Sequence, residues 1–132
     1  MTGEQQQQKI LLIEDDKFMS ELIAMRFKKD GITLDWAENA EVGLAKIKTE
    51  KPALILLDIV LPKMGGFEFL KKIKADKETA SIPVIILSNL GQKVEIEQGM
   101  KLGAKDYLIK ANFDLSDIIQ KVNQALKEEA KD

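Results

Sequence analysis

Short apolar runs alternate with longer amphipathic segments along the chain. Four of the runs are too short for a typical helix and are rich in Ile, Leu or Val, which is typical of strands buried on both faces of a sheet. These four runs are Ile10–Ile13, Ala53–Leu57, Ile82–Leu87 and Tyr107–Ile109. Ile32, Leu34 and Trp36 instead alternate with polar residues. We therefore expect a half-exposed strand there, at an edge of the sheet.

Five segments with a helical spacing of apolar residues separate and follow these strands. The apolar positions of each segment are expected to form its buried stripe. In chain order the stripes are Phe18, Leu22 and Met25; Val42, Ala45 and Ile47; Phe67, Leu70 and Ile73; Val94 to Leu102; and Leu115, Ile118, Ile119, Val122 and Leu126. Asp16 and Asp114 are predicted to cap the N-termini of the first and last helices. Gly31 and Gly103 are predicted to end the first and fourth helices.

Five strands that alternate with five helices predict an α/β fold with a mainly parallel sheet. The chain has 132 residues, which suits one domain, and no internal linker interrupts it. We expect residues 9–127 to form this domain. Residues 1–8 are predicted to be a disordered lead-in, and residues 128–132 a charged tail that frays.

The composition restricts the chemistry that is available. The chain has no cysteine and no histidine, which excludes disulfides, thiolate metal sites and the commonest general base. A net charge of −2 without a basic stripe gives no reason to expect direct binding to nucleic acid. No apolar run approaches the roughly 20 residues of a membrane helix, and residues 1–8 lack the apolar core of a signal peptide. We expect a cytoplasmic protein that uses oxygen ligands for any metal.

The residues that follow the buried strands carry most of the candidate chemistry. The first run is followed by Glu14 and Asp15, the second by Asp58, the third by Ser88 and the fourth by Lys110. In an open parallel sheet, sites form outside the carboxyl ends of the strands, near the point where the strand order reverses. The sequence therefore predicts three carboxylates, a hydroxyl and an ammonium at one edge of the sheet.

These charges do not balance. Three neighbouring carboxylates repel one another, and one lysine leaves about two negative charges in excess, so either a carboxylate takes up a proton or a cation fills the gap. Oxygen ligands suit Mg²⁺, which prefers one or two carboxylates together with phosphate oxygens. A carboxylate, a divalent cation, a lysine and a hydroxyl around one point are the parts that phosphoryl transfer uses.

The stretches that carry these residues resemble the receiver domain of response regulators in two-component signalling. In layout the chain is similar to the single-domain chemotaxis type. The matching stretches are KILLIEDD at 9–16, LILLDIVLPKMGG at 54–66, PVIILSN at 83–89 and GAKDYLIK at 103–110. The resemblance covers about residues 9 to 127. It implies a flavodoxin-like, doubly wound sheet of five parallel strands in the order 2-1-3-4-5 with five helices, which agrees with the edge strand expected above.

The resemblance also implies a function. Asp58 would take a phosphoryl group from a sensor histidine kinase or a histidine phosphotransfer protein, with Mg²⁺ as cofactor, and the partner-binding face would then change. The chain would catalyse its own modification and would not be a turnover enzyme. The expected partners are the phosphodonor and an unknown downstream protein, with no direct contact to nucleic acid or membrane. A monomer or weak dimer is expected.

The same likeness implies a role for each site residue. Asp15 and Asp58 would bind Mg²⁺ directly, Glu14 through water and Val60 through its carbonyl oxygen. Phosphoryl oxygens would be held by Ser88 and Lys110, and the aromatic switch would be formed by Ser88 and Tyr107.

Two positions leave alternatives open. Ala111 follows Lys110 where the family usually has proline after a cis peptide bond. A cis bond without proline costs about 2.5–4 kcal/mol, so the Lys110–Ala111 bond is either a strained cis bond or a trans bond that shifts the lysine backbone. Gly99 lies inside the fourth helical segment, where glycine costs roughly 0.5–1 kcal/mol relative to alanine. It is either a tight packing contact or part of a helix loosened to move on phosphorylation.

Two other functions compete with this interpretation. A haloacid-type phosphatase with an aspartyl nucleophile normally has a second acid two residues later, where this chain has Val60. A pseudo-receiver that binds partners without phosphorylation usually lacks the acceptor, an acid or the lysine, and all are present here. Nucleotide binding is disfavoured because neither GxGxxG nor GxxxxGK occurs.

Overall fold

Five strands form one parallel sheet within residues 9–130, the part of the chain that the computed structural model describes. The strands are β1 (Lys9–Ile13), β2 (Thr33–Ala37), β3 (Leu54–Leu57), β4 (Val84–Ser88) and β5 (Asp106–Ile109). Their order is β2-β1-β3-β4-β5, and all neighbours are parallel. The predicted order and the predicted edge position of residues 32–36 are confirmed. The order reverses between β1 and β3, so a crevice is expected at their carboxyl ends.

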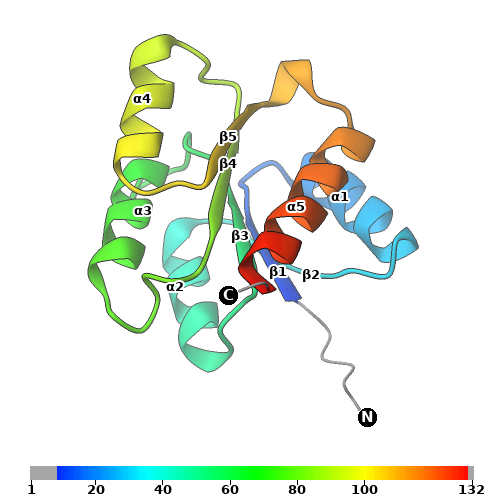
Figure 1. Cartoon of the computed structure of the whole chain (residues 1–132), viewed down its shortest axis with the longest axis horizontal. Coiled ribbons are helices and arrows are strands. Elements are labelled where there is room, and N and C mark those ends of the chain that lie inside the picture. The colour runs from blue at the N-terminus through cyan, green and yellow to red at the C-terminus, as the bar shows by residue number, and fades with distance from the viewer. Residues whose placement is uncertain (1–8, 131–132) are drawn as a thin grey trace.

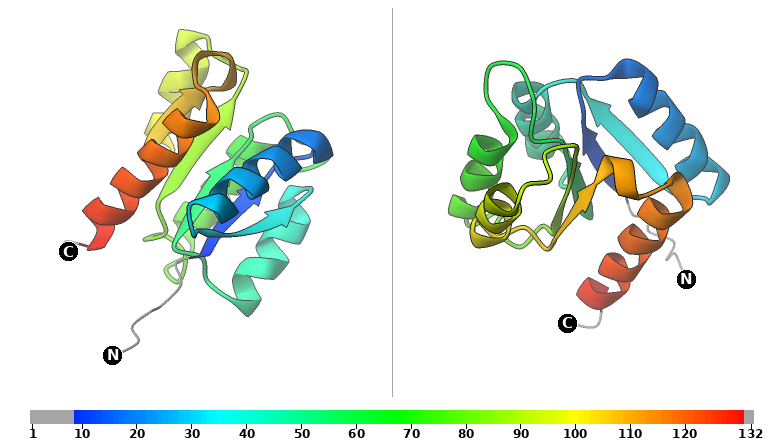
Figure 2. Two further views of the ribbon diagram at one scale, coloured as in Figure 1. Left: turned by 90° about the vertical axis from the view of Figure 1, so that its right-hand side faces the viewer. Right: turned by 90° about the horizontal axis from the view of Figure 1, so that it is seen from above.

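Helices cover both faces of this sheet, which confirms the doubly wound arrangement (Figures 1 and 2). The helices are α1 (Lys17–Lys29), α2 (Ala40–Thr49), α3 (Gly66–Ala75), α4 (Lys93–Lys101) and α5 (Leu115–Ala130). In Figure 1, α1 and α5 lie on one face of the sheet and α2, α3 and α4 on the other. A 3₁₀ turn at Lys110–Asn112 leads from β5 into α5.

The strands supply two separate hydrophobic cores, because successive side chains point to opposite faces. The core beneath α2, α3 and α4 includes Leu57 and Phe69. The core beneath α1 and α5 includes Leu12 and Phe27. Both faces of the central strands are thereby buried, which explains their near-continuous apolar sequences.

The predicted buried stripe of α1 is wrong. Phe18 and Met25 are each 70% exposed and Leu22 is 37% exposed. The helix instead buries Ser20, Ile23 and Phe27. Both sets of residues recur every three or four positions, so the helical period fits either one. The side that meets the sheet is decided by how the short connection from β1 places the helix.

The stripe of α2 was predicted correctly at one position of three. Ile47 is buried, but Val42 and Ala45 are exposed. The helix packs through Ala40 and Gly43 instead. At Gly43 a Cβ atom would come within 2.7 Å of a side-chain carbon of β1, so close helix–sheet packing replaces an apolar side chain there.

The remaining stripes agree better with the structure. In α3, Leu70 and Ile73 are buried and Phe67 is half-buried. The α5 stripe is buried except for its half-buried first residue, Leu115. The exception is α4, in which Gly99 is the buried residue.

The predicted helix caps are confirmed. Asp16 accepts a hydrogen bond from the Met19 amide at the start of α1, and Gly31 follows this helix with φ = 77°, a conformation that favours glycine. Asp114 and Asp117 form reciprocal backbone-to-carboxylate hydrogen bonds at the start of α5.

The C-terminal helix is longer than expected, since α5 continues through Ala130. Residues 128–130, placed in the fraying tail, are therefore helical, and Lys105 forms ion pairs with Glu128 and Glu129 on this last turn. The predictions for residues 1–8, 131 and 132 lie outside the described residues, and the domain limits at 9 and 127 stay a prediction.

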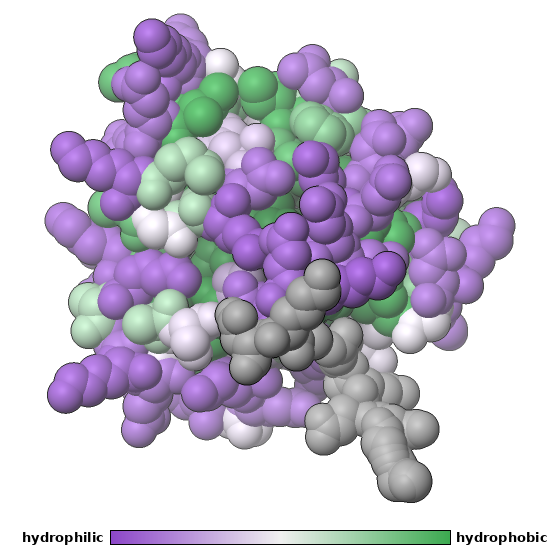
Figure 3. Space-filling model, viewed as in Figure 1, coloured by the Kyte–Doolittle hydropathy of each residue, from purple (hydrophilic) through white to green (hydrophobic). Residues whose placement is uncertain are grey.

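Within residues 9–130 no helix is long and apolar enough to cross a bilayer. Figure 3 shows a mainly hydrophilic face with smaller apolar areas between the polar side chains.

Candidate functional site

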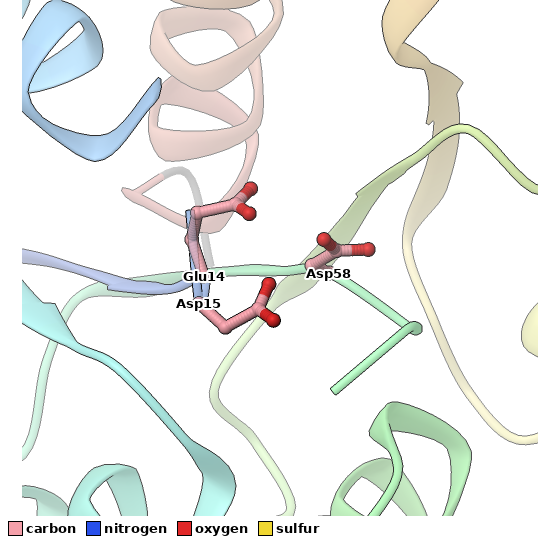
Figure 4. Close-up of side chains that lie close together, drawn as sticks. All are labelled: Glu14, Asp15 and Asp58. Atoms are coloured by element: carbon pink, nitrogen blue, oxygen red, sulfur yellow. The ribbon is translucent and has the colours of Figure 1, made fainter. Parts of the chain in front are cut away.

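Three carboxylates meet at the carboxyl ends of β1 and β3. Glu14 and Asp15 follow β1, Asp58 follows β3, and one oxygen of each lies within 4.8 Å of the other two. Figure 4 shows Glu14 and Asp15 extending toward Asp58. Glu14 is 1% exposed and Asp58 5% exposed, whereas Asp15 is open to solvent. The strand ends thus bring together the three predicted carboxylates, which we call the acid cluster, and this cluster could hold a metal ion.

Lys110 reaches the acid cluster from the end of β5. Its Nζ atom lies 2.7 Å from Glu14 Oε1 and 3.1 Å from Asp58 Oδ2. The peptide bonds among the described residues are all trans, so the Lys110–Ala111 bond takes the trans alternative. The lysine still contacts Asp58, and the substitution of alanine for proline has not displaced its ammonium group from the cluster.

The electrostatics of the cluster favour an added positive charge. Burial raises the pKa of the Glu14 carboxyl; the close ion pair with Lys110 opposes this rise and the charge of Asp58 adds to it. Burial would lower the pKa of Lys110, but Glu14 and Asp58 outweigh it and raise that pKa, so the lysine stays charged. Glu14 Oε1 faces this ammonium, yet accepts no hydrogen bond of regular geometry from the described residues. One lysine therefore does not balance the negative charge of the three carboxylates.

The loop after β3 holds the Asp58 carboxylate in place. The Asp58 amide donates to the carbonyl of Ile13 at 3.0 Å, which ties the residue to β1. Its Oδ1 accepts a hydrogen bond from the Val60 amide at 3.1 Å. The two Asp58 oxygens are thus contacted by different groups, one by this amide and the other by Lys110. The role of the Val60 carbonyl as a metal ligand stays a prediction.

Gly66 is a site residue that the sequence reasoning missed. A Cβ atom there would lie 2.5 Å from the carbonyl oxygen of Asp58 and 2.6 Å from the Cα of Ile59. The Gly66 amide also donates to the Ile59 carbonyl at 3.0 Å. The start of α3 can therefore approach the loop after β3 only because residue 66 has no side chain. The sequence signal for this contact is the pair Gly65-Gly66.

A second missed contact comes from the edge strand β2. The indole Nε1 of Trp36 donates to the carbonyl oxygen of Glu14 at 2.7 Å. The Glu14 amide donates to the Ala37 carbonyl at 3.1 Å. Glu14 Oε2 accepts from the Asp16 amide at 3.1 Å. The apolar pattern predicts Trp36 only as a residue of a half-exposed edge strand, and its separation of 22 residues from Glu14 hides the contact.

The two predicted switch residues meet at the backbone of Leu90. Ser88 is fully buried, and its Oγ accepts from the Leu90 amide at 3.3 Å. The hydroxyl of Tyr107 donates to the Leu90 carbonyl. Burial raises the pKa of this hydroxyl, with further contributions from Glu95 and Asp58, so it keeps the proton that it donates. Ser88 and Tyr107 thus bind the backbone amide and the backbone carbonyl of Leu90, respectively.

Gly99 of α4 packs directly against this arrangement. A Cβ atom on Gly99 would lie 2.7 Å from Ile86 Cδ1 and 3.0 Å from Tyr107 Cδ2. Of the two alternatives for this glycine, these distances support a tight packing contact. The absent side chain leaves room for the ring of Tyr107 beneath the helix.

Comparison with known proteins identifies the family. Residues 10–123 match the model of the response regulator receiver domain. The chain belongs to this family. The receiver domain is 36% identical over 119 residues to the DNA-binding dual master transcriptional regulator RpaA of Synechocystis sp., covering 90% of this chain and 49% of RpaA. It is 33% identical over 118 residues to protein PilH of Pseudomonas aeruginosa, covering 89% of this chain and 97% of PilH.

Solved receiver structures share the fold. A CheY-like receiver domain protein from Methanospirillum hungatei is 28% identical with a TM-score of 0.87, covering 96% of this chain and 98% of that one. The receiver domain of a Francisella response regulator is 32% identical with a TM-score of 0.83, covering 91% and 97%. The predicted family, fold and place in two-component signalling are therefore confirmed. Receiver domains accept phosphoryl groups from histidine kinases or phosphotransfer proteins. The chain spans about half the length of several curated relatives that it matches.

Proposed function

We propose that Asp58 is the phosphoacceptor of this receiver domain and that Mg²⁺ bound at the acid cluster is its cofactor. The observation that carries the proposal is the setting of Asp58 itself. It is a buried carboxylate whose two oxygens contact Lys110 and the Val60 amide, beside two further carboxylates. A buried acid at the end of an apolar strand is costly unless it is compensated, so this arrangement calls for a function.

The donor set of the acid cluster fits Mg²⁺. All of its ligand atoms are oxygens, and Glu14, Asp15 and Asp58 would hold the ion together with the Val60 carbonyl. The negative charge of three carboxylates beside a single lysine gives the ion a place where protein groups alone are insufficient. When bound, Mg²⁺ supplies positive charge that stabilises the developing charge on phosphoryl oxygens.

The residues of the chain then have defined parts in the transfer. An oxygen of Asp58 attacks phosphorus of the donor, and an O–P bond forms as the donor P–N bond breaks. The electron pair of the broken bond stays on the imidazole nitrogen, which takes a proton from solvent. Lys110, already 3.1 Å from Asp58, balances charge on the phosphoryl oxygens. Ser88 Oγ accepts from Leu90 and so keeps its own proton free to donate to such an oxygen.

A protein phosphodonor is supported by the surface beside the acid cluster. The wrongly predicted stripe of α1 leaves Phe18 and Met25 on the surface. A groove of about 260 Å³ lies between α1 and the start of α5. It is lined by Met19, Leu22, Leu87, Lys110, Phe113, Asp114, Leu115 and Ile118. Because Lys110 contributes to both the groove and the acid cluster, a histidine kinase or phosphotransfer protein seated on these apolar residues would reach Asp58. The chain would be modified in this step without acting as a turnover enzyme.

The test is incubation of the whole chain with acetyl phosphate and Mg²⁺, followed by intact mass. We expect a gain of one phosphoryl group in the wild type, none in Asp58→Asn, and none with EDTA. Asp35→Asn is a matched control, because Asp35 lies on β2 in an ion pair with Lys46 and should leave labelling unchanged. Equal labelling of Asp58→Asn and the wild type would contradict the proposal. Sustained turnover of a phosphomonoester would instead favour the phosphatase alternative.

A further inference from the structure

Trp36 is the one tryptophan of the sequence and lies on the edge strand β2. It pairs in register with Leu12 of β1, and its half-buried side chain packs against the core beneath α1 and α5. From there its indole Nε1 reaches the carbonyl oxygen of Glu14 at 2.7 Å, a normal length for a strong N–H···O hydrogen bond. An edge residue thus contacts the backbone of the acid cluster.

Both backbone groups of Glu14 are held by β2. The amide donates to the Ala37 carbonyl at 3.1 Å, which extends the β1–β2 pairing by one residue. The carbonyl accepts from the indole of Trp36, at a point where β2 has ended at Ala37. The peptide unit that joins Glu14 to Asp15 is therefore fixed at its oxygen by a side chain.

The orientation of Asp15 depends on this peptide unit. Glu14 has other restraints, because its carboxylate contacts Lys110 and the Asp16 amide. Within residues 9–130 no hydrogen bond or ion pair holds the exposed carboxylate of Asp15. Its direction is consequently set by the backbone that carries it, and Trp36 restrains that backbone through its hydrogen bond to the Glu14 carbonyl oxygen.

We propose that Trp36 is a positioning residue for the acid cluster: its indole N–H orients the Glu14–Asp15 peptide and so sets the affinity of the cluster for a divalent cation. The inference rests on the proposed function, because it takes the acid cluster as the cation site. Groups that orient metal ligands without touching the metal commonly control affinity. The ring is well suited to this part, since its apolar body is anchored in the core and its polar edge is free to donate.

The experiment compares Mg²⁺ affinity, measured by isothermal titration calorimetry, in the whole chain and two variants. Trp36→Phe keeps an aromatic ring but removes the N–H donor. Leu34→Ala is the matched control, because Leu34 lies on the same strand and packs against the same core without contacting Glu14. We expect Trp36→Phe to bind Mg²⁺ about three- to tenfold more weakly, as one hydrogen bond allows. Leu34→Ala should bind within about twofold of the wild type.

A second readout does not depend on affinity. The single indole gives one N–H resonance in NMR spectra. In metal-free protein this proton should exchange slowly with solvent, and its chemical shift should move during a Mg²⁺ titration of the wild type and of Leu34→Ala. Rapid exchange of the indole proton in metal-free protein would overturn the proposal, because the hydrogen bond would then not persist in solution.

The possible results distinguish the role of Trp36 from the proposal that the acid cluster binds a cation. Equal affinity of Trp36→Phe and the wild type overturns the role of Trp36, as does an equal loss in Trp36→Phe and Leu34→Ala, which would reflect packing. If Asp15→Asn binds Mg²⁺ as tightly as the wild type, or if the wild type binds none, the cation site itself is refuted and the role of Trp36 falls with it.

Discussion

The acid cluster and the hydrogen-bonded group around Leu90 lie at neighbouring strand ends but are built on opposite principles. The second group, which we call the Leu90 junction, consists of Ser88, Leu90, Gly99 and Tyr107. The acid cluster holds charges of one sign in excess, and burial raises the pKa of Glu14. The Leu90 junction is neutral, with its polar groups paired and its glycine packed against the tyrosine ring. The acid cluster thus has an excess of negative charge, whereas the Leu90 junction has paired polar groups and close packing.

The difference shows how a small domain can couple chemistry to shape. Excess buried charge makes the acid cluster sensitive to any added cation or phosphoryl group. The junction is held by neutral hydrogen bonds that are each worth only about 1 kcal/mol, so a modest change in free energy can rearrange it. Asp58 contributes to the raised pKa of Tyr107, which indicates that the two regions already interact electrostatically. Breaking each region in turn should therefore have different consequences.

The largest effect is expected from Gly66→Ala, at the edge of the acid cluster. The new Cβ would lie 2.5 Å from the Asp58 carbonyl oxygen, and backbone atoms cannot move aside cheaply. We expect a loss of about 2–3 kcal/mol in the free energy of unfolding, measured by urea denaturation. Gly65→Ala is the control, since its Cβ would have 4.0 Å to the nearest atom and should cost less than about 1 kcal/mol. Similar losses in both variants would contradict the close contact at Gly66.

Tyr107→Phe should have a smaller effect, confined to the Leu90 junction. It removes the hydroxyl that donates to the Leu90 carbonyl and should cost about 1 kcal/mol of unfolding free energy. Thr79→Val is a matched control, because it removes a hydroxyl-to-carbonyl hydrogen bond to Ile73 elsewhere. Both variants should lose similar stability, but the Leu90 amide resonance should shift in Tyr107→Phe alone. An unchanged Leu90 resonance would show that the junction is not formed in solution.

Gly99→Ala tests whether the junction tolerates crowding. Its Cβ would meet the tip of Ile86 and the edge of the Tyr107 ring, both of which are side chains that can shift. The gain in helix propensity offsets part of the strain, so the net loss should stay below about 1 kcal/mol. The ring resonances of Tyr107 should nevertheless move. Met100→Ala, at an exposed position of the same helix, should leave them in place, and a shift in both variants would argue against a direct contact.

The last prediction concerns the pH dependence of the metal-free protein. The folded-state pKa of Glu14 is raised, chiefly by burial. Its contribution to stability is therefore complete below its unfolded pKa of about 4.3 and is lost as pH rises through the folded value. In EDTA, the wild type should lose stability relative to Glu14→Gln as pH is raised from about 4.5, measured by urea denaturation. Glu21→Gln, exposed on α1, should run parallel to the wild type, and a parallel course of Glu14→Gln would refute the prediction.

The sequence by itself determined the strands, the acid cluster and the family, because the signal for each of these features comes from residues that are close together along the chain. Short apolar runs, here of three to six residues, mark the buried strands, and the residues that follow parallel strands lie at the same edge of the sheet. Glu14, Asp15, Asp58 and Lys110 could thus be placed together without coordinates, because each lies within two residues of the end of such a run. The helix caps at Asp16 and Asp114 were equally local, since each depends on residues within one turn.

Only the tertiary structure decided which side of each helix is buried and which distant groups touch. The α1 stripe of Phe18 and Met25 satisfied the helical period as well as the truly buried side did, because periodicity does not specify orientation toward the sheet. Trp36, Gly66 and the backbone of Leu90 act through contacts between segments far apart in the chain. Such contacts leave no periodic signal, since they arise from the distance at which two packed elements come to rest.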